Sequence, residues 1–288
     1  MSSSPPLFIL APAHSLAPWV NAALGQHPQL EALPSIPLLT QELIRMPHRL
    51  EWQNALIGAI AQARWERLDE TALDWARHWL LRQSPRNGAS MRLTLADWIA
   101  PRQMVERNLC YLHPKVLDRI QRLFPEAYYL HLTCHPVLHG RAAGRWRVRS
   151  GQRPALIDLT RTWLMPVLIT LEFFEGLPRE KRLTLRGEDF LKEPANYLGQ
   201  LIKWLGLNED RDAIATMLHP ERWPFAETEL DWAAFSDDRE FLAYPGLPIA
   251  RGWPDHTEED IAPGMTHEIR HYARLLGYTE NDQSAYSE

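Results

Sequence analysis

Two short histidine-containing motifs carry the residue types of a metal or catalytic site. His267-Glu268-Ile269-Arg270-His271 matches H-E-x-x-H. On a helix, the two histidines of such a motif bind zinc and the glutamate acts as general base. Catalytic zinc needs a third protein ligand as well, and little beyond a polar tail follows this segment. We therefore expect a structural helix here and no metal.

Cys134, His135 and His139 form a second group of potential metal ligands or reactive side chains. Their spacing is not that of a zinc knuckle. Cys134 would act as a nucleophile only with a lowered pKa and a base such as His135 or His14 beside it. The alternative, which we favour, is a buried and inert cysteine.

A third candidate is an anion site near the N-terminus. The apolar run 7–10 predicts a buried strand, and Pro18 suits the first turn of a helix. His14 and Ser15 lie in the loop between them, where N–H groups at the start of a helix bind phosphate. The alternatives are that His14 packs within the loop and that Ser15 only caps the helix.

The elements that would position these residues alternate along the chain. Apolar runs predict strands at 7–10, 128–132 and 183–185, and apolar periodicity predicts helices at 18–25, 116–123, 162–174, 197–205 and 263–276. The stretch 41–83 is mostly helical in pattern and forms a helical insert. We expect an α/β fold of three layers, with a short parallel sheet flanked by helices. One domain spans residues 1–278, and 279–288 is a polar tail.

The segment Phe8 to Trp19, continuing to Gly25-Gln26-His27-Pro28, resembles the opening of sulfotransferases that use 3′-phosphoadenosine 5′-phosphosulfate (PAPS). In particular it resembles a bacterial branch of the family that is often found beside polyketide and peptide synthetases. In that branch the segment reads roughly I-L-S-P-P-R-S-G-S-T-L-L and ends in G-x-H-P. Four further segments follow in family order: 129–136 (F-I-H-L-V-R-H-P), 163–174 (W-L…I-L-E-F-L), 185–194 (R-Y-E-D-L…D-P) and 217–226 (H-P-E-x-S-P-F-A). The resemblance implies a P-loop-like sulfotransferase fold and PAPS as cofactor.

The residues that the family uses to hold PAPS are largely replaced. In the first loop, His14 stands at the basic position and Leu16 at the glycine position, and only Ser15 keeps a hydroxyl. Leucine adds bulk where the backbone must approach an anion, and Pro18 lacks an N–H. Cys134 stands where an arginine reaches the 3′-phosphate, and a thiol carries no fixed positive charge.

The acceptor side differs too. Ser35 stands where the family often has a glutamate that acts as base, and Val167 and Ile169 replace a polar histidine and asparagine. By resemblance, the candidate catalytic residues are His14 and Ser35. The candidate cofactor contacts are His14, Ser15, Cys134 and Arg141.

Arg141 matches an arginine that the family often has, and three more arginines follow at 145, 147 and 149. They could hold a phosphate from a new direction, because arginine forks suit phosphate. The alternative is a solvated basic face. Several tryptophans of the insert could line an apolar acceptor cleft, although core packing explains most of them.

Composition excludes several classes of protein. The 288 residues carry a net charge of −5 and two cysteines, which argues against a general nucleic-acid binder and a disulfide framework. No apolar run is long enough for a membrane span, and we expect a cytoplasmic protein with no nucleic-acid or membrane partner.

Three functions follow from the resemblance and the replacements. The first is transfer of a sulfuryl group from PAPS to a hydroxyl of a small or carrier-bound metabolite through a remodelled site. The second is a different reaction on the same scaffold, without PAPS. The third is a non-catalytic binding or scaffold protein. The oligomeric state stays open.

Overall fold

The computed structural model describes residues 4–40, 50–83, 88–153, 155–233, 236–248 and 264–278. Its strands form a five-stranded sheet in the order β2-β3-β1-β4-β5, and every neighbouring pair is parallel. The strands are β1 (Leu7–Leu10), β2 (Leu30–Ala32), β3 (Gln103–Arg107), β4 (Tyr128–Thr133) and β5 (Arg182–Arg186). The expected α/β architecture with a parallel sheet is thus confirmed.

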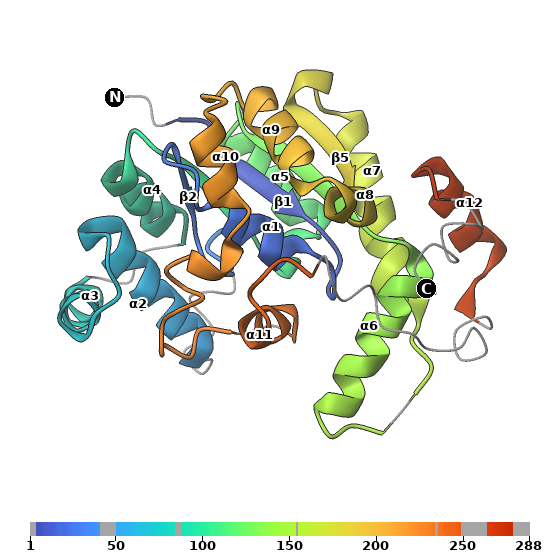
Figure 1. Cartoon of the computed structure of the whole chain (residues 1–288), viewed down its shortest axis with the longest axis horizontal. Helices are drawn as coiled ribbons and strands as arrows, with labels where there is room; N and C mark the ends of the chain where they lie inside the picture. Colours follow the sequence, from blue (N-terminus) through green and yellow to red (C-terminus); the bar gives the residue numbers. More distant parts are fainter. Residues whose placement is uncertain are drawn as a thin grey trace.

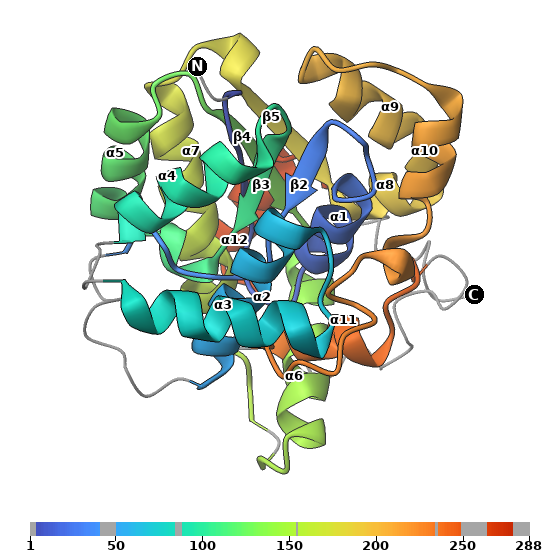
Figure 2. The ribbon, with the colours of Figure 1, turned by 90° about the vertical axis from the view of Figure 1, so that its left-hand side faces the viewer.

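Helices cover both faces of this sheet (Figure 1). They are α1 (Ala17–Leu24), α2 (Leu50–Trp65), α3 (Glu70–Arg82), α4 (Gly88–Ile99), α5 (Pro114–Leu123), α6 (Pro136–Arg149), α7 (Met165–Glu175), α8 (Gly187–Lys192), α9 (Pro194–Trp204), α10 (Arg211–Met217), α11 (Ser236–Ala243) and α12 (His267–Leu275). A π-helical turn, Thr160–Leu164, leads into α7. Figure 2 shows α2, α3 and α4 together on one side of the molecule.

Side chains of β1 alternate between two separate cores, as the pleat of a strand requires. Leu7 and Ile9 join the large core under α1, α2 and α9, whereas Phe8 and Leu10 join the smaller core with α5 and α7. The first strand is therefore buried on both faces, which is why its sequence is a continuous apolar run.

The two strands that sequence patterns did not predict, β2 and β3, carry buried charges. In β3, Glu106 is paired with Arg92 of α4 at 2.7 Å, and in β2, Glu31 is paired with Arg102 at 2.7 Å. Buried charges are tolerated only with such partners, and the partners are distant in sequence. The three strands predicted from apolar runs are confirmed.

Within the insert predicted at 41–83, the structure shows α2 and α3, and residues 41–49 lie outside the described ranges. The predicted tail 279–288 also lies outside them. No helix in the described part of the chain is both long and apolar enough to cross a bilayer.

Candidate functional site

The candidate site lies where β1, β4 and β5 end. Because β1 pairs with β4 and β4 pairs with β5, their carboxyl ends meet at one edge of the sheet. The loop 11–16, the turn from β4 into α6 and the start of α8 follow these ends. Open parallel sheets bind ligands at this edge, where helices begin.

The first loop packs against α6. His14 has a left-handed backbone, with φ of 54°, and its ring lies 6.3 Å from His139 and 5.7 Å from Trp146, centroid to centroid. Burial lowers the pKa of His139 to about 3, and the neighbouring His14 acts in the same direction. His139 is therefore neutral, and its ring lies beside that of His14.

The start of α1 offers few free donors to an anion. The Ser15 Oγ accepts the N–H of Ala17 at 3.3 Å, so this hydroxyl serves the turn, and Pro18 has no N–H to give. Leu16 occupies the N-cap position without a side-chain hydrogen bond and is 2% exposed. This loop is an apolar helix start rather than an open anion cradle.

Leu16 fills space next to the start of α8. A Cβ added at Gly187 would lie 3.0 Å from Leu16 Cδ1 and 3.4 Å from the carbonyl oxygen of Thr133. In the R-Y-E-D motif noted above, position 187 corresponds to a tyrosine. The lack of a side chain at 187 thus leaves room for Leu16.

Cys134 lies in a separate apolar cluster with Trp163, Tyr278 and residues of α7 and α12. Trp163 Nε1 donates to the Cys134 carbonyl oxygen at 2.8 Å. Burial raises the pKa of the Cys134 thiol well above its usual value, and Glu188 acts in the same direction. A neutral, buried thiol serves neither as phosphate contact nor as nucleophile.

Tyr278 and Glu188, which the sequence analysis did not single out, close the carboxyl end of β4. Glu188 accepts the backbone N–H of His135 at 2.6 Å and the Tyr278 hydroxyl at 3.1 Å. The Arg186 guanidinium lies 4.4 Å from the Tyr278 ring centroid. Burial raises the pKa of Glu188, against the hydrogen bond from His135. Ninety positions separate Glu188 from Tyr278, so no local pattern could have indicated this contact.

Ser35, the candidate catalytic residue at the position of the family's glutamate base, lies near the end of β3. Its hydroxyl is buried and accepts from Asn108 Nδ2 at 3.1 Å. The neighbouring Arg107 is paired with Asp238 of α11, and both side chains are buried. This arginine is the cation at the end of β3, and its charge is neutralised within the fold.

Arg141 and Arg145 belong to the helix whose His139 and Trp146 contact His14, but with 3.6 residues per turn they lie on a different face of it. Arg141 Nε and Arg145 Nη1 are buried, and neither atom has a hydrogen-bond partner among the described residues. Burial lowers the pKa of Arg145, Glu240 of α11 raises it, and Arg149 and Arg141 lower it. Buried guanidinium nitrogens without partners are costly unless a ligand or water reaches them.

The residues at the candidate site differ in whether they could hold the phosphate groups of PAPS. The positions that correspond to the family motifs, Leu16 and Cys134, are buried and do not fit an anion. The buried guanidinium nitrogens of Arg141 and Arg145 do fit one.

The metal motif lies on the surface. His267, Glu268 and His271 are exposed on α12. In the described ranges, no three histidine, cysteine, aspartate or glutamate side chains gather as a metal site would require.

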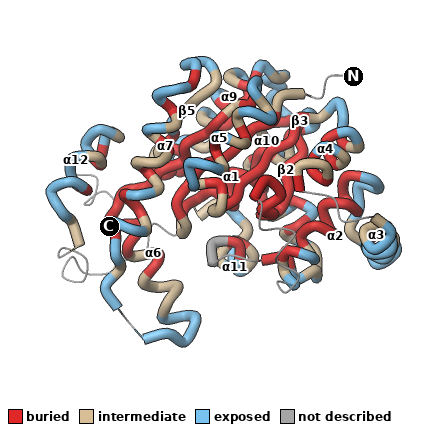
Figure 3. Tube along the Cα trace, turned by 180° about the vertical axis from the view of Figure 1, so that it is seen from behind, coloured by how far each residue is buried: buried red, intermediate tan, exposed pale blue. Residues whose placement is uncertain are grey.

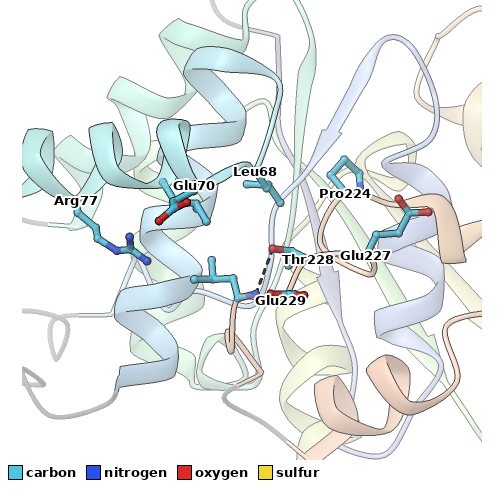
Figure 4. A pocket seen from close by; sticks show the side chains of 9 residues that line it. Leu68, Glu70, Arg77, Pro224, Glu227, Thr228 and Glu229 are labelled. Atoms are coloured by element: carbon cyan, nitrogen blue, oxygen red, sulfur yellow. Dashed lines mark hydrogen bonds between the residues drawn. The ribbon is translucent and has the colours of Figure 1, made fainter.

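A cavity of about 650 Å³ lies between the start of α3 and the segment 224–230. Figure 4 shows Glu70 and Arg77 on one side and Glu227 and Glu229 on the other. None of the candidate residues lines it.

Comparison with known proteins agrees with this geometry. The chain matches the sulfotransferase family over residues 5–211. The sulfotransferase domain from the curacin biosynthetic pathway superposes with a TM-score of 0.76 at 22% identity, covering 96% of this chain and 99% of that one. The sulfotransferase domain of the Synechococcus PCC 7002 olefin synthase gives 0.74 at 18% identity, with 96% of each chain covered.

A sulfotransferase from Alicyclobacillus acidocaldarius gives a TM-score of 0.51 at 16% identity over the whole of both chains. No curated protein matches the chain in sequence. The family match covers more than half of the residues, and the solved structures share the fold. The chain belongs to the sulfotransferase family.

Proposed function

We propose that the chain transfers a sulfuryl group from PAPS to a hydroxyl of a small or carrier-bound metabolite through a remodelled site. The observation that carries the proposal is the pair of buried, unpartnered nitrogens of Arg141 and Arg145. They lie on the helix that packs against the first loop, and family membership supplies the reaction class.

PAPS, when bound, would supply the sulfuryl group: a bond from sulfur to the acceptor oxygen forms, the bond from sulfur to the 5′-phosphate oxygen breaks, and the hydroxyl proton passes to a base, for which His14 is the candidate. The protein positions the reactants and balances negative charge. Arg141 and Arg145 would hold phosphate by their forked donors. His14 and Ser15 are the remaining polar groups of the first loop, and Ser35 stands near the end of β3 as the candidate residue on the acceptor side.

Binding of the product nucleotide, 3′-phosphoadenosine 5′-phosphate (PAP), tests the proposal. Isothermal titration calorimetry should give a dissociation constant below 1 mM for the wild type, and Arg141→Gln with Arg145→Gln should weaken it by about tenfold to a hundredfold, at about 1.5–3 kcal/mol for a charged hydrogen bond. The matched control is Arg161→Gln with Arg179→Gln, which removes two exposed arginines elsewhere. Equal affinity in both double variants would refute the role of α6.

A second candidate function has its own support. The burial of Leu16 and Cys134 at positions that touch PAPS in the family favours a protein that works without PAPS, as a different enzyme or a binding partner. The calorimetry separates the two, because this candidate requires that millimolar PAP gives neither heat nor a shift in melting temperature.

A further inference from the structure

A basic arm projects from the body of the protein. We define the arm as α6 and the segment that follows it, residues 136–157, with residue 154 outside the described ranges. Figure 1 shows α6 extending away from the sheet, and Figure 3 shows that its far half is the less buried part. His139 near the start of α6 and Trp146 near its end both contact His14 of the first loop.

The charge of the arm has one sign. Between Glu126 and Asp158 the sequence has five arginines (Arg141, Arg145, Arg147, Arg149 and Arg153) and no aspartate or glutamate. The chain as a whole has a net charge of −5, so this positive surface stands on an acidic protein. In the described residues, neither Arg149 nor Arg153 takes part in an ion pair; both are exposed.

The tip of the arm, residues 147–156, begins with a structured turn. Gly151 is left-handed, with φ of 72°, and the N–H of Gln152 donates to the Arg147 carbonyl oxygen at 2.9 Å. The N–H of Gly151 donates to the carbonyl oxygen of Val148 at 3.0 Å. These two bonds form a Schellman motif, so the turn presents its arginines in a defined geometry.

Two aliphatic side chains accompany the arginines at the tip. Val148 is 56% exposed and Leu156 is 75% exposed. Trp146, the aromatic residue of α6, is turned inward onto His14. The tip therefore combines positive charge with a small apolar area, which is typical of a protein interface. Two aliphatic side chains and no outward aromatic are too little for a helix that lies in a membrane.

Arginines in the last turn of α6 also interact favourably with the helix dipole. That effect explains Arg147 and Arg149, which lie in this turn. It does not explain Arg153, which follows the turn, or the exposed Val148 and Leu156.

We infer that the tip of the arm is a docking surface for an acidic protein, and that this partner is the carrier that presents the acceptor to the site. The inference rests on the proposed function, because the site needs an acceptor and the arm leads from the tip to the first loop. Carboxylates on the carrier would complement the arginines, and apolar side chains beside them would cover Val148 and Leu156. Such charge complementarity raises the association rate and fixes orientation.

The test uses a holo acyl carrier protein as probe, with binding measured by calorimetry at 50 and 300 mM salt. We expect Arg149→Glu with Arg153→Glu to weaken binding at 50 mM salt by at least about tenfold, and high salt to weaken wild-type binding similarly. The control, Lys203→Glu with Arg211→Glu, makes the same change in net charge at two exposed positions of α9 and α10 and should bind as the wild type does.

Thermal melting shows whether the charge reversal disturbs folding. If it does, the neutral variant Arg149→Gln with Arg153→Gln takes its place in the binding measurement. Equal weakening in the tip variant and the control overturns the inference, and so does absence of carrier binding. Tighter binding to phosphatidylglycerol vesicles or to duplex DNA than to the carrier also overturns it. The tip variant should keep the wild-type affinity for PAP. A wild-type protein that binds PAP but not the carrier therefore refutes the docking surface alone, and one that binds the carrier but not PAP refutes the proposed donor site alone.

Discussion

Acid should destabilise this protein partly through one histidine of the sheet. His131 of β4 is 1% exposed, and neither ring nitrogen has a hydrogen-bond partner in the described part of the chain. The centroid of its ring lies 6.1 Å from the centroid of the Phe174 ring. Burial lowers its pKa from 6.5 to about 4. The folded state thus holds His131 neutral at a pH where the unfolded chain would protonate it.

The sign follows from proton linkage. A histidine with a lowered pKa in the fold contributes stability above pH 6.5 that is lost as the pH falls toward its folded pKa, because the unfolded state binds the extra proton. Between pH 7 and pH 5, this linkage amounts to about 2 kcal/mol of unfolding free energy for His131. That is a large fraction of the stability of a typical domain, about 5–15 kcal/mol.

The variant His131→Leu removes the titrating ring and its two unpartnered nitrogens. Urea unfolding, followed by tryptophan fluorescence, gives the unfolding free energy at pH 7 and pH 5 for the wild type and the variant. The loss between the two pH values should be smaller by about 2 kcal/mol in the variant. His113→Asn, which replaces an exposed histidine at the start of α5, should lose as much as the wild type.

His131→Gln keeps a polar side chain that does not titrate, so its loss of stability should match that of His131→Leu. It replaces the leucine variant if leucine does not pack at this position. An equal loss of stability in the wild type and in both His131 variants would show that the ring is not held neutral in the fold, and the argument from burial would be wrong.

Two further predictions concern the carboxyl end of β4. Tyr278→Phe removes the hydroxyl that donates to Glu188 and leaves a buried carboxyl oxygen without this partner, so thermal melting should show a loss of about 1–3 kcal/mol; an unchanged melting temperature would contradict the contact. Iodoacetamide at pH 8 should label the partly exposed Cys110 well before Cys134, because the Cys134 thiol is buried and its pKa is raised. Mass spectrometry of the peptides gives the order of labelling. Rapid labelling of Cys134 would show that its thiol is reactive.

The sheet could be predicted from sequence where its strands are apolar throughout. Phe8 and Ile9 face different cores and both must be hydrophobic, so β1 is visible as a run. In β3, Glu106 and Arg107 interrupt the run, and their partners, Arg92 and Asp238, lie 14 and 131 positions away. Their pairing is decided by tertiary structure, which periodicity does not contain.

At the candidate site, the sequence indicated which positions lack the polar or charged residues of the family. It did not indicate which side chains pack at those positions. The burial of Leu16 is consistent with its apolar type, whereas its contact with Gly187 needs β1, β4 and β5 placed side by side. The approach of Trp146 to His14 likewise depends on how α6 leaves the sheet. Tyr278 could not be identified from the sequence because its partner Glu188 lies far from it along the chain.

The close fit of Leu16 against Gly187 constrains how this lineage could change. A tyrosine at position 187 would place its Cβ 3.0 Å from the Leu16 methyl carbon, so the leucine side chain must shift slightly to admit it. A glycine restored at 16 by itself would leave a hole in the core. The two positions are therefore energetically coupled, and the effects of substitutions at 16 and 187 on stability should not add.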